Sequence, residues 1–234
     1  MKYFNRITLT SFTLLLLAMT LGAFTGLPGF AALVILSAIV MSLVRRDVAV
    51  VLLTSMLIGF LFEELGVHTG LPFGHYTYNF PPYLLSIPVF VILGWGVFSV
   101  ICYYAVMDLP TRYRLVFFPL MMTAIDVSLD PQMVHLHFWT WEPFGPEWYG
   151  VPLTNFLGWY VVSLIIITIT TIITRDSRDL RPVNPYFIIP YFLLVILVIP
   201  PVLLTPFITG AALAGVLSMM IYLVSRRVNA RISQ

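Results

Sequence analysis

The chain has 234 residues, of which 60% are hydrophobic and 9% are charged, with a mean hydropathy of +0.98 and a formal net charge of +2. A soluble domain typically carries about a quarter charged residues, so this composition excludes a water-soluble globular protein. Without a clustered basic face it also argues against a nucleic-acid-binding protein. The single cysteine, Cys102, excludes a disulfide framework and a cysteine metal cluster.

Apolar runs recur along the whole chain, and a membrane-spanning helix needs about 20 such residues. In chain order, these runs predict helices over residues 7–26, 27–44, 48–65, 84–106, 115–130, 153–174, 186–204 and 207–225. The fifth is short, with Pro119 near its first turn, and the seventh is expected to kink at Pro200-Pro201. We therefore predict an all-α integral membrane protein, a bundle of about eight transmembrane helices in a single polytopic domain over residues 1–234.

Basic residues predict the orientation of this bundle, because those in short loops stay on the cytoplasmic side. Eight crossings place all 12 lysine and arginine residues on one side, whereas seven crossings would split the set. Both termini of this multi-pass protein of the cell membrane are thus expected to be cytoplasmic. Lys2 and Arg6 precede the first run as in a signal peptide, but no small-residue cleavage site is evident, which favours a retained helix.

The same topology gathers six acidic residues and all four histidines at the outer side, away from any lysine or arginine. They are Glu63, Glu64, Asp126, Asp130, Glu142, Glu147, His68, His75, His135 and His137. Titratable groups without permanent countercharges are where catalytic chemistry is expected. The probable site-bearing core is therefore 60–160.

Two pairs of acids are the candidates for catalysis. Glu63 and Glu64 are neighbours and point about 100° apart on a helix, so they cannot both face one site equally well. Asp126 and Asp130 are four residues apart and share one helix face, where repulsion favours a form in which one carboxyl keeps its proton. Such a carboxyl can act as a general acid. Asp130 could instead simply end the helix before Pro131, whereas Asp126 lies a full turn inside an apolar helix, where a carboxylate is functional by default.

The loops after these acids are rich in aromatic residues. An aromatic belt at the membrane interface explains most of them, but they could also line a site for a long apolar substrate or stabilise a carbocation. His135 and His137 could bind a metal with the aspartates, although their spacing is unspecific, and no metal or cofactor is predicted. Asn155 is either a polar site residue or the cap of the helix that begins there.

These segments resemble the membrane family of carotenoid biosynthesis proteins, which includes carotenoid 1,2-hydratases and archaeal bisanhydrobacterioruberin hydratases. The resemblance covers roughly residues 63–159. Its matching residues are Glu63-Glu64-Leu65-Gly66, Gly70, Phe73-Gly74, Tyr76, Tyr78, Asp126, Asp130-Pro131, Trp139, Trp141, Gly150-Val151-Pro152, Asn155-Phe156 and Gly158-Trp159. Elsewhere only hydropathy supports it.

The resemblance implies cofactor-free addition of water to a terminal trisubstituted double bond of a C40 or C50 polyene. Such a hydro-lyase protonates the alkene and lets water capture the carbocation, which needs a carboxylic acid and a base that orients water. Asp126 is the first choice for the acid, with Asp130 or Glu64 as the partner and Glu63 as a further catalytic candidate. The implied substrate-binding residues are His75, Tyr76, Tyr78, Trp139, Trp141, Asn155 and Trp159. We therefore predict a membrane-embedded carotenoid (acyclic isoprenoid) hydratase in contact with membrane lipid.

Two other functional classes are also compatible with the sequence. Asp126 and Asp130 resemble half of the paired aspartate motifs with which prenyltransferases hold magnesium and diphosphate, but a second motif and basic phosphate ligands are missing. A proton-coupled transporter could relay protons through intramembrane acids, although no internal repeat is visible. Solute-coupled proton flux in liposomes would indicate transport, whereas conversion of a lipid substrate would indicate an enzyme.

Overall fold

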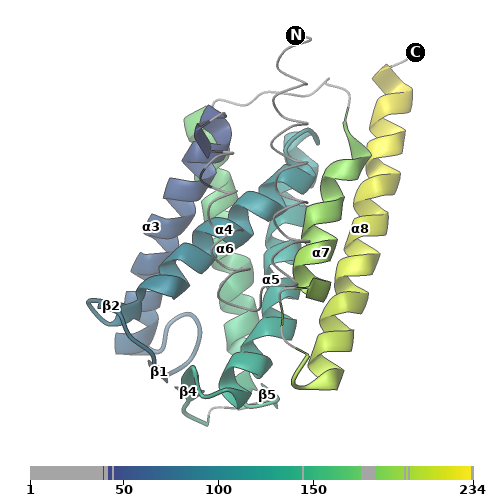
Figure 1. Cartoon of the computed structure of the whole chain (residues 1–234). Helices are drawn as coiled ribbons and strands as arrows, with labels where there is room; N and C mark the ends of the chain where they lie inside the picture. Colours follow the sequence, from purple (N-terminus) through teal and green to yellow (C-terminus); the bar gives the residue numbers. More distant parts are fainter. Residues whose placement is uncertain are drawn as a thin grey trace.

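Six α-helices form most of the molecule, a computed structural model that describes residues 39, 42–43, 45–143, 145–174, 183–197, 199 and 201–232. The helices are α3 (Arg46–Thr69), α4 (Val89–Val106), α5 (Thr111–His135), α6 (Leu153–Thr174), α7 (Ile189–Leu197) and α8 (Leu204–Ile232), with a short 3-10 helix η1 (Pro185–Ile188) before α7. They run side by side with their connections at two ends (Figure 1).

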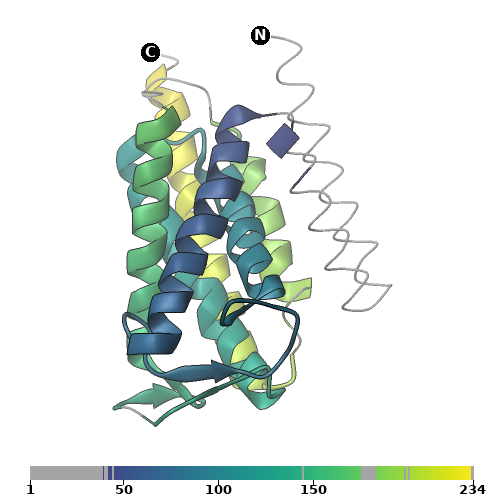
Figure 2. The same cartoon turned by 90° about the vertical axis from the view of Figure 1, so that its left-hand side faces the viewer.

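Three short antiparallel strand pairs lie at one end of these helices. Strand β1 (Tyr76–Tyr78) pairs with β4 (Trp139–Trp141), β2 (Tyr83–Leu84) with β3 (Ile87–Pro88), and β5 (Glu147–Trp148) with β6 (Val151–Pro152). The β1–β4 pair joins the loop after α3 to the loop after α5 (Figures 1 and 2). The two aromatic loops of the sequence are therefore parts of one structure.

The chain is mostly helical and has the surface of a membrane protein. Four helices, α3, α4, α6 and α8, are long and apolar enough to cross a membrane. Leu53, Leu57, Leu61 and Leu65 form a stripe of exposed side chains along α3. Such a stripe is unfavourable in water and fits the acyl chains of lipid.

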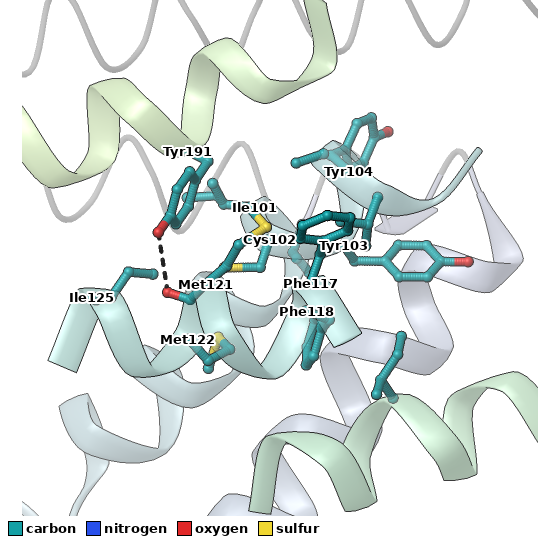
Figure 3. Packing of buried hydrophobic residues seen from close by; sticks show 14 of the residues in the cluster. Ile101, Cys102, Tyr103, Tyr104, Phe117, Phe118, Met121, Met122, Ile125 and Tyr191 are labelled. Atoms are coloured by element: carbon teal, nitrogen blue, oxygen red, sulfur yellow. Dashed lines mark hydrogen bonds between the residues drawn. The ribbon is translucent and has the colours of Figure 1, made fainter. Parts of the chain in front are cut away.

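Helix α4 is the most enclosed of these four spans. Nearly all of its second half is buried against α5 and α7, where Tyr191 of α7 donates a hydrogen bond of 3.3 Å to the carbonyl oxygen of Met121 (Figure 3). Cys102 lies inside this cluster as a buried thiol. The core of the bundle thus forms around α4.

The predicted helix boundaries are partly confirmed. The helix over 153–174 is confirmed as α6, and those over 48–65 and 207–225 are extended at both ends in α3 and α8. The start at residue 84 is wrong, because residues 83–88 form the β2–β3 pair before α4 begins. The kinked helix over 186–204 is also wrong, since α7 ends at Leu197 and α8 begins at Leu204. The described residues form six α-helices and not the eight that the sequence predicts. The predicted spans over 7–26 and 27–44 lie outside the described residues apart from residues 39, 42 and 43.

Helix α5 also departs from the short helix predicted over 115–130. It begins at Thr111 and continues through Pro131 to His135, so Asp130 does not end it. A proline in a helix leaves the carbonyl four residues earlier without its N–H donor. Here that carbonyl belongs to Val127, and the indole Nε1 of Trp148 donates to it at 3.2 Å. A tertiary hydrogen bond thus replaces the missing helical one.

Arginines occur at one end of the bundle, and a separate group of acidic residues lies toward the other. The arginines that the structure describes lie at the end opposite to the strand pairs, and they are Arg45, Arg46, Arg112, Arg114, Arg226, Arg227 and Arg231. Glu63, Glu64, Asp126 and Asp130 lie toward the strand end. Acidic side chains at that end have no arginine or lysine of the described residues beside them.

Candidate functional site

Two buried carboxyl groups meet between α5 and α6. Asp126 and Asp130 are 0% and 4% exposed. Asn155, in the first turn of α6, donates from Nδ2 to Oδ2 of Asp126 and to Oδ2 of Asp130, each at 2.7 Å. Because one nitrogen contacts both groups, the two carboxyls lie side by side. The Asn155 side chain is thus engaged by the aspartates and not by the backbone at the start of its own helix.

One oxygen of this carboxyl pair is unusual. Oδ1 of Asp126 is buried and has no hydrogen-bond partner among the described residues. Burying an ionised carboxylate without a cation or sufficient donors is strongly unfavourable, by several kcal/mol for each ion, and two adjacent ones also repel. The pair is therefore an arrangement that favours retention of a proton, which is what a general acid requires.

Glu63 of α3 is a third buried carboxyl, and it is surrounded by donors. The hydroxyl groups of Tyr76 and Tyr78 both donate to its Oε2, the latter at 2.7 Å, and Nε1 of Trp95 in α4 donates to Oε1 at 2.8 Å. Three donors on two oxygens stabilise a carboxylate. Glu63 therefore differs from the Asp126–Asp130 pair in having every oxygen satisfied.

The two tyrosines link Glu63 to the carboxyl pair. Burial, followed by the charge of Glu63, raises the pKa of Tyr76 and of Tyr78 well above the usual value for tyrosine, and the charge of Asp130 adds to the shift. Both hydroxyl groups therefore keep their protons at neutral pH and act as donors. Since the charges of Asp130 and Glu63 both act on these tyrosines, Glu63 lies close enough to the Asp126–Asp130 pair for their charges to influence one another.

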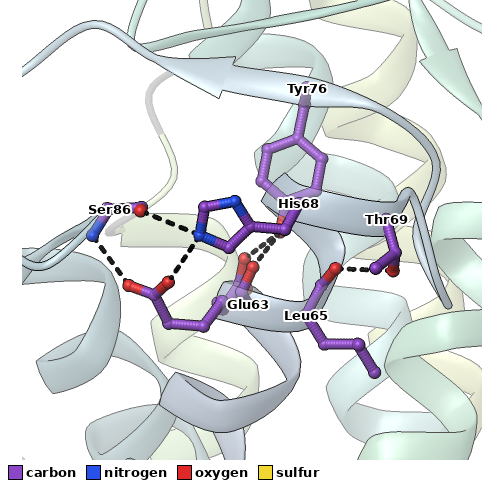
Figure 4. A network of polar contacts seen from close by, with 7 residues as sticks. Glu63, Leu65, His68, Thr69, Tyr76 and Ser86 are labelled. Atoms are coloured by element: carbon purple, nitrogen blue, oxygen red, sulfur yellow. Dashed lines mark hydrogen bonds and ion pairs between the residues drawn. The ribbon is translucent and has the colours of Figure 1, made fainter.

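Glu64 faces a different environment, as its position next to Glu63 predicts. Its Oε1 accepts a hydrogen bond of 2.7 Å from the backbone nitrogen of Ser86, and its Oε2 lies 3.2 Å from Nε2 of His68. Ser86 Oγ lies 3.3 Å from the same Nε2 (Figure 4). A nucleophilic triad needs the acid and the serine on opposite nitrogens of the imidazole, so these residues instead tie α3 to the β2–β3 pair.

Most of the predicted substrate-binding aromatics surround the acids. Tyr76 packs on Trp141 with ring centroids 4.5 Å apart, and Tyr78 packs edge-on against Trp139 at 5.7 Å. Trp159 lies one helical turn beyond Asn155 and stacks on Trp95, with centroids 4.1 Å apart and planes at 19°. His75, by contrast, is exposed at the surface.

Trp95 is the residue of this site that the sequence did not indicate. It lies in the middle of an apolar helix and is 1% exposed, yet it contacts both Glu63 and Trp159. Its local sequence does not distinguish it from a lipid-facing or core tryptophan. The contact with Glu63 depends on the packing of α4 against α3, which local sequence does not reveal.

Close backbone approach holds the strand end of the site against the helices. A Cβ atom on Gly66 of α3 would lie 2.7 Å from the hydroxyl oxygen of Tyr76, and one on Gly158 of α6 would lie 2.5 Å from Cδ1 of Phe73. Neither distance is tolerated by real side chains. Glycine at both positions therefore lets the segment before and within β1 sit between α3 and α6.

The histidines considered as metal ligands lie apart from this cluster. His135 and His137 are exposed at the end of α5. Within the described part of the chain, no three His, Cys, Asp or Glu side chains are arranged so that they could hold a metal ion.

The hydrogen bond from Trp95 to Glu63 predicts that removing its donor lowers the stability of the protein measurably. Trp95→Phe keeps an aromatic ring against Trp159 but removes the N–H that Oε1 of Glu63 accepts. Losing a hydrogen bond to a buried charged group typically costs about 1.5–3 kcal/mol, and we expect that loss in thermal unfolding of the detergent-solubilised protein. Trp148→Phe, which removes a longer bond to a backbone carbonyl, is the matched control and should cost less. Equal losses would contradict the description of Glu63 as a buried carboxylate that depends on its donors.

Comparisons with known proteins agree on one kind of protein. The family model described as carotenoid biosynthesis protein matches residues 11–224. The chain is 30% identical over 135 residues to bisanhydrobacterioruberin hydratase of Haloarcula japonica, an alignment that covers 53% of this chain and 45% of that protein. The matched part is thus less than half the length of that relative. No solved structure matches the chain.

Proposed function

Because this chain belongs to the carotenoid biosynthesis protein family, we propose that it is a membrane-embedded hydratase that adds water to a terminal double bond of an acyclic polyene by acid catalysis. The observation that carries the proposal is the buried Asp126–Asp130 pair with an unpartnered oxygen. Family membership implies a lipophilic isoprenoid substrate, and the related protein from Haloarcula japonica is named as a hydratase.

The chemistry uses groups that the chain itself provides. The O–H bond of a protonated Asp126 breaks as its proton forms a C–H bond with the less substituted alkene carbon. The π electrons leave a tertiary carbocation. Water attacks this carbon and gives a protonated alcohol, whose extra proton passes to the carboxylate of the pair, so the acid is regenerated and the sum is one alkene plus one water giving one alcohol. Proton transfer by a positioned side chain typically contributes about 10²–10⁴-fold to the rate.

The surrounding residues suit a cationic intermediate. The stacked rings of Trp95 and Trp159 and the rings of Tyr76 and Trp141 offer π faces, which attract cations. Glu63 supplies a fixed negative charge whose oxygens are occupied by Tyr and Trp donors, so it can stabilise a carbocation without attacking it as a free nucleophile. In this assignment Asp126 is the acid and Asp130 the base for water. Glu64, which accepts a hydrogen bond from the backbone of Ser86, has a structural role.

The location of the acids within the membrane protein is part of the proposal. We place the chain in the cell membrane as a multi-pass protein of eight crossings with both termini on the cytoplasmic side. The segregation of the described arginines from the acids supports this orientation. The carboxyl pair then lies in the outer half, where a polyene dissolved in the bilayer reaches it without crossing an aqueous phase.

Expression in a bacterium that accumulates lycopene or an acyclic C50 carotenoid tests the function. We expect pigments heavier by the mass of one or two water molecules, detected by mass spectrometry of the extracted carotenoids. An empty vector supplies the background. Unchanged pigments from cells that contain the folded, membrane-inserted protein would overturn the assignment to these carotenoids. Proton flux in liposomes would then test the transport alternative.

A further inference from the structure

The side-chain amide of Asn155 donates to two carboxyl groups of the protein itself. We propose that Asn155 is a positioning residue that joins Asp126 and Asp130 into one proton-sharing acid and leaves Oδ1 of Asp126 as the proton-delivering atom. This inference rests on the proposed function and names the part of the site that controls the proton.

The hydrogen bonds define which oxygens are available. A side-chain amide nitrogen carries two hydrogens, and those of Asn155 are directed to Oδ2 of Asp126 and Oδ2 of Asp130 at 2.7 Å each. An oxygen that accepts an N–H bond is a less favourable place for an added proton than one without a donor. Oδ1 of Asp126, buried and unpartnered among the described residues, is therefore the favoured place for a proton that can be transferred.

The packing of α6 holds the amide in place. Asn155 is 1% exposed, and Trp159, one turn further along α6, stacks on Trp95 of α4. The neighbouring Thr154 donates a hydrogen bond of 3.0 Å to the carbonyl oxygen of Phe73. The first turn of α6 is thus anchored on both sides, and its amide has little freedom to follow a substrate.

The charged and titratable groups that face the pair favour retention of a proton. From α3 comes Glu63, and from β1 come Tyr76 and Tyr78, whose pKa values are raised by burial, by the charge of Glu63 and, to a smaller extent, by that of Asp130. Helix α8 contacts α5 through Gly210 against Ser128, which points to the opposite face of α5 from the two aspartates, and this contact brings no titratable group to the pair. The described surroundings of the pair therefore bring negative charge and neutral donors, and no cation.

Asn155→Leu tests the role, because leucine has a similar volume and no donor. The anionic form of the pair loses the amide donor that its two carboxyls share, so we expect its protonated form to persist to higher pH. Turnover of the carotenoid should fall by at least about tenfold, with its pH profile shifted in the same direction and KM little changed, since general-acid contributions are of order 10²–10⁴. Gln132→Leu is the matched control, because Gln132 is also a buried amide of this region but bonds only to the backbone of Leu203. It should lower stability and leave the pH profile in place.

Infrared spectroscopy separates this inference from the proposed function. The detergent-solubilised native protein should show the carbonyl stretch of a protonated carboxyl at neutral pH that Asp126→Asn lacks, and Asn155→Leu should shift the pH at which this band disappears. If Asn155→Leu does not accumulate, Asn155→Ser replaces it, since a hydroxyl has one proton to donate and can serve only one carboxyl. An identical titration in native protein and variant overturns the inference even when pigments are hydrated. A shifted band without hydration supports it while overturning the function.

Discussion

Asp126→Asn is expected to abolish hydration while leaving the protein folded. The substitution keeps the shape of the side chain and removes the proton that the alkene must receive. We expect turnover to fall at least about 100-fold, because a positioned general acid contributes about 10²–10⁴-fold. Only Asp130 then remains as a buried carboxyl at this place, so the repulsion between two adjacent carboxyls is lost and no buried charge is added. The thermal unfolding midpoint should therefore stay equal or rise.

The measurement compares pigment masses in cells that carry equal amounts of native and variant protein. Glu147→Gln is the control, because Glu147 is an exposed acid in β5 at the same end of the molecule. It should hydrate carotenoids at the native rate. Near-normal hydration by Asp126→Asn would remove this residue from the mechanism and shift attention to Glu63.

Gly210→Val is expected to give the largest loss of stability. A Cβ atom on Gly210 of α8 would lie 2.3 Å from Cβ of Ser128 in α5, closer than any real pair of such atoms. Overpacking a close contact typically costs about 1–3 kcal/mol and occasionally more. Here both sides are helix backbone with little room to move, so we expect a loss of at least about 3 kcal/mol. Because Ser128 belongs to the helical turn that carries Asp126 and Asp130, displacing this turn should impair hydration as well.

Thermal unfolding in detergent and membrane accumulation measure this effect. Gly215→Val in the same helix is the matched control, since the nearest atom to a Cβ there is 3.9 Å away on Phe192. It adds the same side chain to the same helix without the clash. A similar stability for both variants would show that α8 does not pack closely against α5 at Ser128.

The arrangement of the acids could be predicted to different degrees. The shared face of Asp126 and Asp130, and the divergence of Glu63 from Glu64, follow from helix geometry alone. The structure agrees with both. The continuation of α5 through Pro131 could not be predicted from helix geometry. The carbonyl group that the proline leaves without a donor accepts a hydrogen bond from the indole of Trp148, which is distant in the sequence. A local pattern contains no information about such a partner.

The sequence alone determined the kind of molecule and the end at which to look for a site. Apolar runs, few charges and the placement of all basic residues on one side are properties of composition and order, so they can be recognised without knowledge of any contact. Tertiary structure decided which acids act together. Glu63 gains its donors from β1 and α4, Asn155 brings the two aspartates together from α6, and Glu64 is bonded to the backbone of Ser86. Those choices depend on how separate helices pack, because hydrogen bonds between distant segments form only where packing brings donor and acceptor within about 3 Å.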